Sequence, residues 1–124
     1  MKFGTVINCM DGRVQIPVIE WIKNNFDVEY VDVITEPGPD KILATSTDDL
    51  ILRRLQSKAE ISVKVHRSKL IAVVGHFDCA GNPVTEEEHK LQIIESVKKI
   101  KSWDFDTEIL GLWVNENWVV HRIV

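Results

Sequence analysis

Three short runs of β-branched residues restrict the fold of this chain more than any other feature of its sequence. They contain Val6 and Ile7, residues 31–34 and residues 71–74, and none of them shows strict alternation of apolar and polar positions. Runs of this kind are typical of parallel strands that are buried on both faces. We therefore expect three buried parallel strands.

Segments with helical periodicity separate these runs. An apolar stripe covers residues 18–26, and Pro17 before it is tolerated in a first helical turn. A second stripe covers residues 51–63 and follows residues 45–48, which offer helix-capping side chains. A third helix is expected over residues 85–100, because it begins with the capping-box pattern Thr-Glu-Glu-Glu.

The C-terminal part of the chain has a different pattern. Residues 108–114 and 118–124 are expected to form two strands, joined by a turn at residues 115–117 in which asparagine is available for positive φ. The element order is then β-α-β-α-β-α-β-β. We expect a single α/β domain over residues 1–124, with three layers, a mostly parallel sheet and an antiparallel C-terminal edge strand.

Composition excludes several classes of protein. Hydrophobic residues make up 44% and charged residues 27%, which is typical of a globular domain. The net charge is -4 and the basic residues are scattered, so nucleic acid is not an expected partner. No segment has the roughly 20 apolar residues of a membrane span, and the N-terminus lacks a signal-peptide pattern. We expect a cytoplasmic, soluble protein, without a membrane partner, whose two cysteines are reduced.

Metal-competent side chains directly follow two of the expected strands. Cys9 follows the first strand, and His76 and Cys79 follow the third. The functional crevice of an open α/β sheet lies beyond the carboxyl ends of its strands. If these two strands are neighbours, about 4.8 Å apart, the three side chains can reach one metal ion. Two thiolates and one imidazole favour zinc over magnesium or calcium, and three protein ligands are typical of a catalytic site.

Other readings of these residues stay open. His89, ten residues beyond Cys79, could serve as a fourth ligand and make the site structural rather than catalytic. The two cysteines and His76 could instead be buried and satisfied by hydrogen bonds alone. Cys9 and Cys79 could also form a redox pair. The joint placement of the three side chains at two strand ends favours the metal.

Three tryptophans flank the expected hairpin. They could form a ligand-stacking surface, although such aromatics are more commonly cross-strand pairs or part of an oligomer interface. The residues are Trp103, Trp113 and Trp118. Together with the exposed edge of the hairpin, they predict a homodimer or a higher homo-oligomer.

The two segments with metal-competent side chains resemble motifs of the β-class carbonic anhydrases. Residues 9–13 read Cys-Met-Asp-Gly-Arg, which is similar to the family's Cys-x-Asp-x-Arg motif. Residues 75–79 read Gly-His-Phe-Asp-Cys, which is similar to the family's Gly-His-x-x-Cys motif. The likeness continues through the strand order to the terminal hairpin.

The resemblance implies a zinc cofactor held by Cys9, His76 and Cys79. It also implies that Asp11 and Arg13 are catalytic residues. In the family this aspartate, held by the arginine, either accepts a hydrogen bond from a zinc-bound water or binds the zinc itself. The implied function is a zinc-dependent hydro-lyase that interconverts carbon dioxide and bicarbonate through zinc-bound hydroxide.

The sequence also departs from the family pattern. Members of the family are usually longer, with an N-terminal helical arm and further C-terminal helices, and Gly12 stands where serine is frequent. Residues 35–40 read Thr-Glu-Pro-Gly-Pro-Asp in place of the family's Arg-Asn-x-Gly loop. The alternatives are therefore a zinc-binding regulatory module without turnover, or a hydrolase of COS or CS2.

Overall fold

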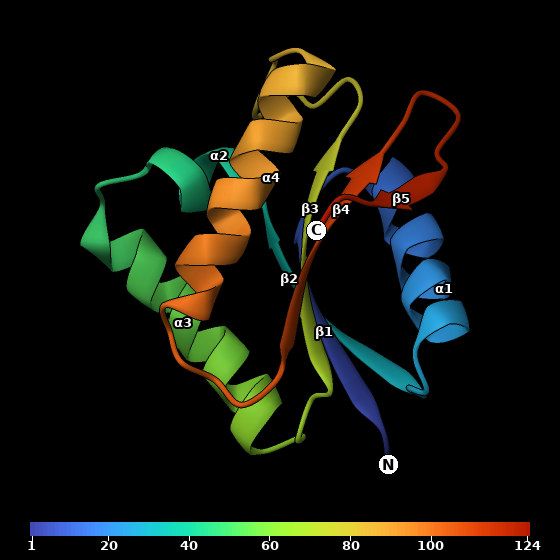
Figure 1. Ribbon diagram of the computed structural model, residues 1–124, viewed down its shortest axis with the longest axis vertical. Helices are drawn as coiled ribbons and strands as arrows, with labels where there is room; N and C mark the ends of the chain where they lie inside the picture. Colours follow the sequence, from blue (N-terminus) through green and yellow to red (C-terminus); the bar gives the residue numbers. More distant parts are fainter.

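A five-stranded sheet forms the centre of the computed structural model, which describes residues 1–124 (Figure 1). Its strands are β1 (Phe3–Cys9), β2 (Tyr30–Glu36), β3 (Leu70–His76), β4 (Glu108–Val114) and β5 (Val120–Arg122). Their spatial order is β2-β1-β3-β4-β5. All neighbours are parallel except β5, which pairs antiparallel with β4. The predicted α/β class and the antiparallel edge strand are confirmed.

Helices cover both faces of this sheet and make three layers (Figure 1). One face carries α1 (Gln15–Asn25), which follows the short 3-10 helix η1 (Gly12–Val14). The other face carries α2 (Pro39–Thr45), α3 (Asp49–Lys64) and α4 (Glu86–Lys101). None of these helices is long and apolar enough to span a membrane.

The core lies in two layers, one on each side of the sheet. In β3, Leu70, Ala72 and Val74 belong to the cluster that packs under α1. Ile71 and Val73 belong to the cluster that packs under α3 and α4. Every residue of β3 is therefore buried, and this explains why the strand reads as an uninterrupted apolar run.

The expectation of a second strand buried on both faces is wrong. β2 pairs only with β1, so it is an edge of the sheet. Tyr30 and Val33 on this strand are 49% and 39% exposed, whereas Ile34 is buried. The β-branched composition predicts that a segment is a strand, but the position of the strand within the sheet depends on the order in which the strands pair.

Residues 35–40, expected as a loop, lead into the additional helix α2. This helix begins after Gly38, whose φ of +60° is in the left-handed region, and Pro39 is among its first residues. Of the residues that could cap α3, Asp48 does so: its carboxylate accepts a hydrogen bond from the Leu50 N–H at 3.0 Å. Thr85 caps α4 as predicted and accepts from the Glu88 N–H at 3.2 Å.

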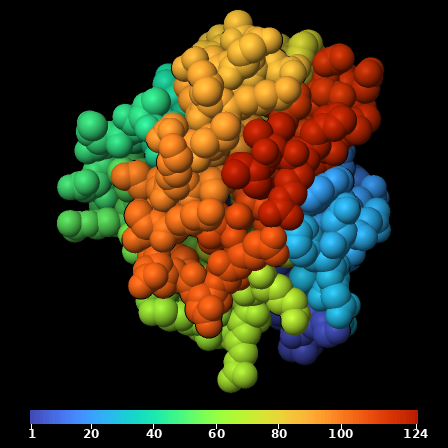
Figure 2. All heavy atoms as spheres, viewed as in Figure 1, coloured from blue at the N-terminus to red at the C-terminus, as the bar shows by residue number.

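The C-terminal hairpin is confirmed, but its second strand is shorter than predicted. The Asn115 side chain accepts hydrogen bonds from the N–H groups of Asn117 and Val119, at 2.9 and 3.0 Å. The positive φ falls on Trp118, at 61°, and on neither asparagine. Figure 2 shows the C-terminal residues (red) between α4 (orange) and α1 (blue) on one face of the molecule.

Candidate metal centre

The ends of β1 and β3 bring three metal-competent side chains together. Cys9 is the last residue of β1, and His76 is the last residue of the neighbouring parallel strand β3. Cys79 follows in the loop after β3. The chain leaves β1 toward β2 on one side, whereas β3 lies on the other side, so the three side chains stand where the strand order reverses.

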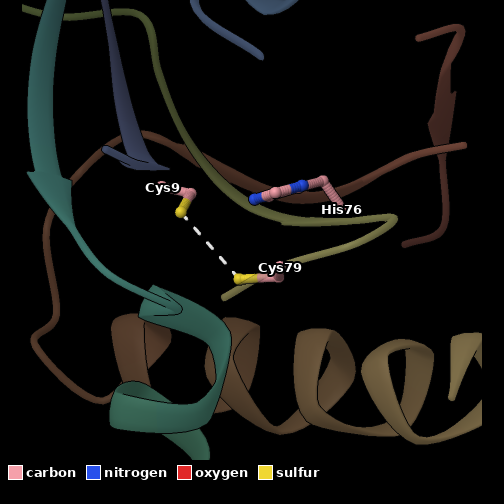
Figure 3. Close-up of side chains that lie close together, drawn as sticks. All are labelled: Cys9, His76 and Cys79. Atoms are coloured by element: carbon pink, nitrogen blue, oxygen red, sulfur yellow. Dashed lines mark hydrogen bonds between the residues drawn. The ribbon is translucent and has the colours of Figure 1, made fainter. Parts of the chain in front are cut away.

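The three side chains have the spacing of ligands around one ion. Figure 3 shows the His76 ring extending toward the two sulfur atoms, which are 3.9 Å apart. One ligand atom from each residue lies within 4.8 Å of the others. Two sulfur atoms bound tetrahedrally at 2.3 Å from a zinc ion would be about 3.8 Å apart. All three side chains are buried, as is common for a preformed metal site.

His76 has one ring nitrogen with a hydrogen-bond partner and one without. Its Nδ1 lies 2.7 Å from the carbonyl oxygen of Phe77, so Nδ1 donates to this oxygen. Nε2 is buried and has no hydrogen-bond partner. An unpaired buried nitrogen is costly, whereas a metal-binding histidine commonly donates its other N–H to a backbone carbonyl. His76 thus has the hydrogen-bonding pattern of a metal-binding histidine, with Nε2 left available to an ion beside the two sulfur atoms.

The two thiols favour different charge states. The hydrogen bond from Cys79 lowers the pKa of Cys9 to about 3, and backbone N–H groups of Gly38 and Asp11 act in the same direction. The same hydrogen bond, together with burial, raises the pKa of Cys79. Burial lowers the pKa of His76, but the nearby Cys9 thiolate and the Phe77 carbonyl leave it raised. A buried thiolate is thus available to a cation.

Asp11 and Arg13 form a bidentate ion pair beside this cluster. Arg13 Nε donates to Asp11 Oδ1 at 3.0 Å, and Nη2 donates to Oδ2 at 2.7 Å. The Arg13 backbone N–H also donates to Oδ1, at 2.9 Å. These hydrogen bonds hold the pKa of Asp11 at about 2, and they raise the pKa of Arg13. Gln15 Nε2 donates to the carbonyls of Cys9 and Asp11 and fixes the loop between them.

The loop that carries Cys79 holds Arg13 from the other side. Arg13 Nη1 donates to Asp78 Oδ2 at 3.2 Å, and Nη2 donates to the Asp78 carbonyl at 3.1 Å. The guanidinium group also stacks over Trp118, 4.6 Å from the centre of the ring. Arg13 therefore ties the loop after β1 to the loop after β3. The sequence analysis missed Asp78, although it stands directly before Cys79.

The sequence decides the family. It matches the family described as "Putative carbonic anhydrase" over residues 1–124. The chain belongs to this carbonic anhydrase family. Among curated proteins no sequence matches it.

Solved structures of β-carbonic anhydrases share the fold of this family member. One is from a study of two tetrameric β-carbonic anhydrases of Sordaria macrospora; its TM-score is 0.64, with 14% identity, over 98% of this chain and 79% of that chain. CafA of Aspergillus fumigatus has a TM-score of 0.62 and 14% identity, over 98% of this chain and 74% of that chain. Isoform I of Trichomonas vaginalis has a TM-score of 0.57 and 18% identity, over 97% of this chain and 81% of that chain.

Two expectations about the surroundings of the centre are corrected. His89 lies outside the metal-competent cluster, and its Nδ1 pairs with Asp40 at 2.6 Å. The three tryptophans, considered as a ligand-stacking surface, each contact a different residue. Trp113 is buried against His89, Trp103 packs against Phe105, and Trp118 packs on Arg13. In this member of the carbonic anhydrase family Trp113 is buried, whereas Trp103 and Trp118 are partly exposed.

Proposed function

We propose that the chain is a zinc-dependent lyase that interconverts carbon dioxide and bicarbonate. The family and the fold support a lyase-type enzyme in general. The observation that carries the specific proposal is the unpaired His76 Nε2, buried beside the sulfur atoms of Cys9 and Cys79 and next to the Asp11–Arg13 pair.

Cys9, His76 and Cys79 are the proposed ligands. Two sulfur atoms and one nitrogen are a donor set that suits zinc, whereas magnesium and calcium prefer oxygen ligands. When bound by three protein ligands, zinc provides a Lewis acid that activates a water molecule for attack on an electrophilic carbon. The hydrogen bond from His76 Nδ1 to the Phe77 carbonyl fixes the orientation of the ring. It leaves Nε2, the other ring nitrogen, available as the ligand atom.

Asp11 is the proposed hydrogen-bond acceptor that orients the attacking water. Because its pKa is about 2, its carboxylate is ionised at every pH at which the enzyme would work. Arg13 occupies both carboxylate oxygens, and Asp78 and Trp118 hold Arg13 in turn. A carboxylate restrained in this way can orient a water molecule by accepting one hydrogen bond, and it is kept from binding the metal itself.

Carbon dioxide hydration by the zinc-loaded chain is the decisive measurement. We expect stopped-flow assays between about pH 7 and pH 9 to show acceleration over buffer, since activated water is formed near neutral pH. The acceleration should disappear when a chelator removes the metal, and it should return when zinc is added. COS and CS2 are assayed in parallel as related substrates. A zinc-loaded, folded chain that accelerates none of these reactions would be a binding or regulatory module instead.

We also propose that the chain forms a homo-oligomer. One of the matching structures is of tetrameric β-carbonic anhydrases. The edge strand β2 has no partner on its outer side and exposes Tyr30 and Val33. Unpaired apolar edges of this kind are commonly covered by a second chain. Sedimentation at micromolar concentration is expected to show a dimer or a larger assembly, and a monomer there would contradict the proposal.

A further inference from the structure

Five polar side chains are buried together between α2, α4 and the loop after β3. They are Asp40, Asn82, His89, Gln92 and Ser96. The Asp40 carboxylate is the centre of the group: Oδ2 accepts from His89 Nδ1 at 2.6 Å, and Oδ1 accepts from Asn82 Nδ2 at 3.1 Å. His89 is the side chain that pairs with the Asp40 carboxylate. Burial of a carboxylate without hydrogen bonds costs much free energy, and these hydrogen bonds offset that cost for Asp40.

The first connection from this group to the metal centre runs through Asn82. Its backbone N–H donates to the carbonyl of Cys79 at 3.2 Å. Its side-chain amide is held in one orientation, because Nδ2 donates to Asp40 Oδ1 and also to Gln92 Oε1, at 2.6 Å. Asn82 Oδ1 is buried without a partner. The contacts of Nδ2 therefore hold the amide in this position.

The second connection is made against β3. A Cβ atom on Gly75, the residue before His76, would lie only 2.5 Å from Asp40 Oδ2. The Asp40 carboxylate thus lies directly against the backbone next to His76. It occupies the space that a side chain at position 75 would need. Ser96 Oγ donates to the Asp40 carbonyl at 3.0 Å and holds this turn of α2 against α4.

The third connection is made through Gly38, two residues before Asp40. Its backbone N–H lies near the Cys9 thiol and lowers the pKa of that group. Its φ is +60°, and an added Cβ would lie 2.9 Å from the Asn82 Cβ and from the Gly81 backbone. The loop before α2 therefore fits closely between Cys9 and the residues that follow Cys79. All three segments that carry the proposed ligands are in contact with the Asp40 group or with the loop that leads into it.

We propose that Asp40, His89 and Asn82 are positioning residues that set the spacing of Cys9, His76 and Cys79 for metal binding. The inference rests on the metal site of the proposed function. Asp40 and His89 are 49 residues apart in the sequence, and each is held on a different helix. Their hydrogen bond fixes α2 against α4, and the contacts of Asn82, Gly75 and Gly38 transmit this position to the three ligand segments.

A second aspartate–histidine pair in the same chain provides a matched control. Asp32 Oδ2 lies 2.6 Å from His66 Nδ1, the same distance as in the Asp40–His89 pair. His66 stacks on Phe3, at the opposite end of β1 from Cys9. The Asp32–His66 pair is only partly buried, whereas Asp40–His89 is fully buried. Loss of the Asp32–His66 pair removes an aspartate–histidine contact of the same length that does not touch a ligand segment.

The test compares His89→Ala with His66→Ala in the full chain. Zinc affinity is measured by competition with a chromophoric chelator, and the ligand geometry by the absorption spectrum of the cobalt-loaded chain. We expect His89→Ala to lower zinc affinity by about 10–100-fold, which is typical for loss of a group that orients metal ligands, and to change the cobalt spectrum. His66→Ala should leave both within error of the parent. His89→Asn keeps an N–H donor near the position of Nδ1, so it should restore most of the affinity.

A measurement without metal separates this proposal from the proposed function. Cys9 and Cys79 are only 3% and 4% exposed. In the metal-free chain, His89→Ala is expected to label faster with a thiol reagent than the parent or His66→Ala, because the ligand loops are released. Should His89→Ala not fold, Asn82→Ala is measured in its place. A parent chain that binds no zinc would end the proposed function, while thiol labelling still decides this inference. Equal labelling in the His89 or Asn82 variant and in the His66 variant would overturn it.

Discussion

Replacement of Cys9 by serine is expected to lower the zinc affinity of the chain about 100-fold or more. The hydrogen bond from Cys79 lowers the pKa of Cys9, which favours the thiolate form that binds a metal ion. Zinc sites with thiolate ligands have an apparent binding free energy of roughly 10 kcal/mol or more. Loss of one of three ligands removes roughly 3 kcal/mol of this, which is about two orders of magnitude in affinity. Elemental analysis after dialysis against a weak chelator measures the effect.

Variants of the other proposed ligands should behave in the same way. Cys79→Ser and His76→Ala are expected to lose zinc, and any carbon dioxide hydration with it. His121→Ala is the control, because this histidine is exposed and lies outside the cluster. Circular dichroism shows whether each variant is folded. A folded Cys9→Ser, Cys79→Ser double variant that retains one zinc per chain would contradict the assignment.

The ligand cluster could be predicted from the sequence because it depends on local features and on one strand pairing. The runs before Cys9 and His76 are apolar enough to be central strands. A ligand at the carboxyl end of such a strand lies in the crevice beyond that edge of the sheet. The single assumption was that β1 and β3 are neighbours, and the structure confirms it. Whether the three residues bind metal stays a prediction.

The sequence could not show features that depend on long-range pairing. Val33 belongs to a run similar to those of β1 and β3, yet it is exposed because β2 is an edge strand. Helix α2 has only seven residues, too few for a periodic pattern, although Gly38 and Pro39 are typical of a helix start. His89 had been considered as a fourth ligand, and its actual partner, Asp40, is 49 residues away in a helix that was not predicted.

For Arg13, one of its contacts could be predicted from the sequence and another could not. The motif predicts its pairing with Asp11, two residues away. Its contact with Trp118 depends on the hairpin turn, in which the tryptophan itself has a positive φ of 61°. A non-glycine residue rarely adopts this conformation, and an asparagine was the expected position for it. With this backbone conformation, the Trp118 ring lies against the Arg13 guanidinium group.

Replacement of Asp11 by alanine is expected to lower the rate of carbon dioxide hydration by roughly 10²–10⁴-fold while zinc stays bound. That range is typical for loss of a side chain that is positioned at the reacting proton. Asp11 lies outside the Cys9, His76 and Cys79 cluster, so its loss leaves the proposed ligands in place. With a pKa of about 2 it is ionised throughout the assay range, and its own titration should not appear in the pH–rate profile of the parent. A zinc-loaded, folded Asp11→Ala variant as fast as the parent would defeat this role.

Arg13→Ala separates a catalytic ion pair from one that only stabilises the loop. If Arg13 keeps Asp11 off the metal, its removal frees the carboxylate to bind there, and the rate falls although Asp11 is intact. If the pair is merely structural, the variant loses stability and keeps its rate.

Asp78→Asn is the matched control for Arg13→Ala. The Asp78 side chain is 68% exposed, and its replacement removes the charge of the other carboxylate on Arg13 while the Asp11 contacts stay in place. We expect this control to keep most of the parent's rate. Because Arg13 acts through Asp11, the Asp11→Ala, Arg13→Ala double variant should be no slower than Asp11→Ala alone, and additive losses would show that the two residues act independently.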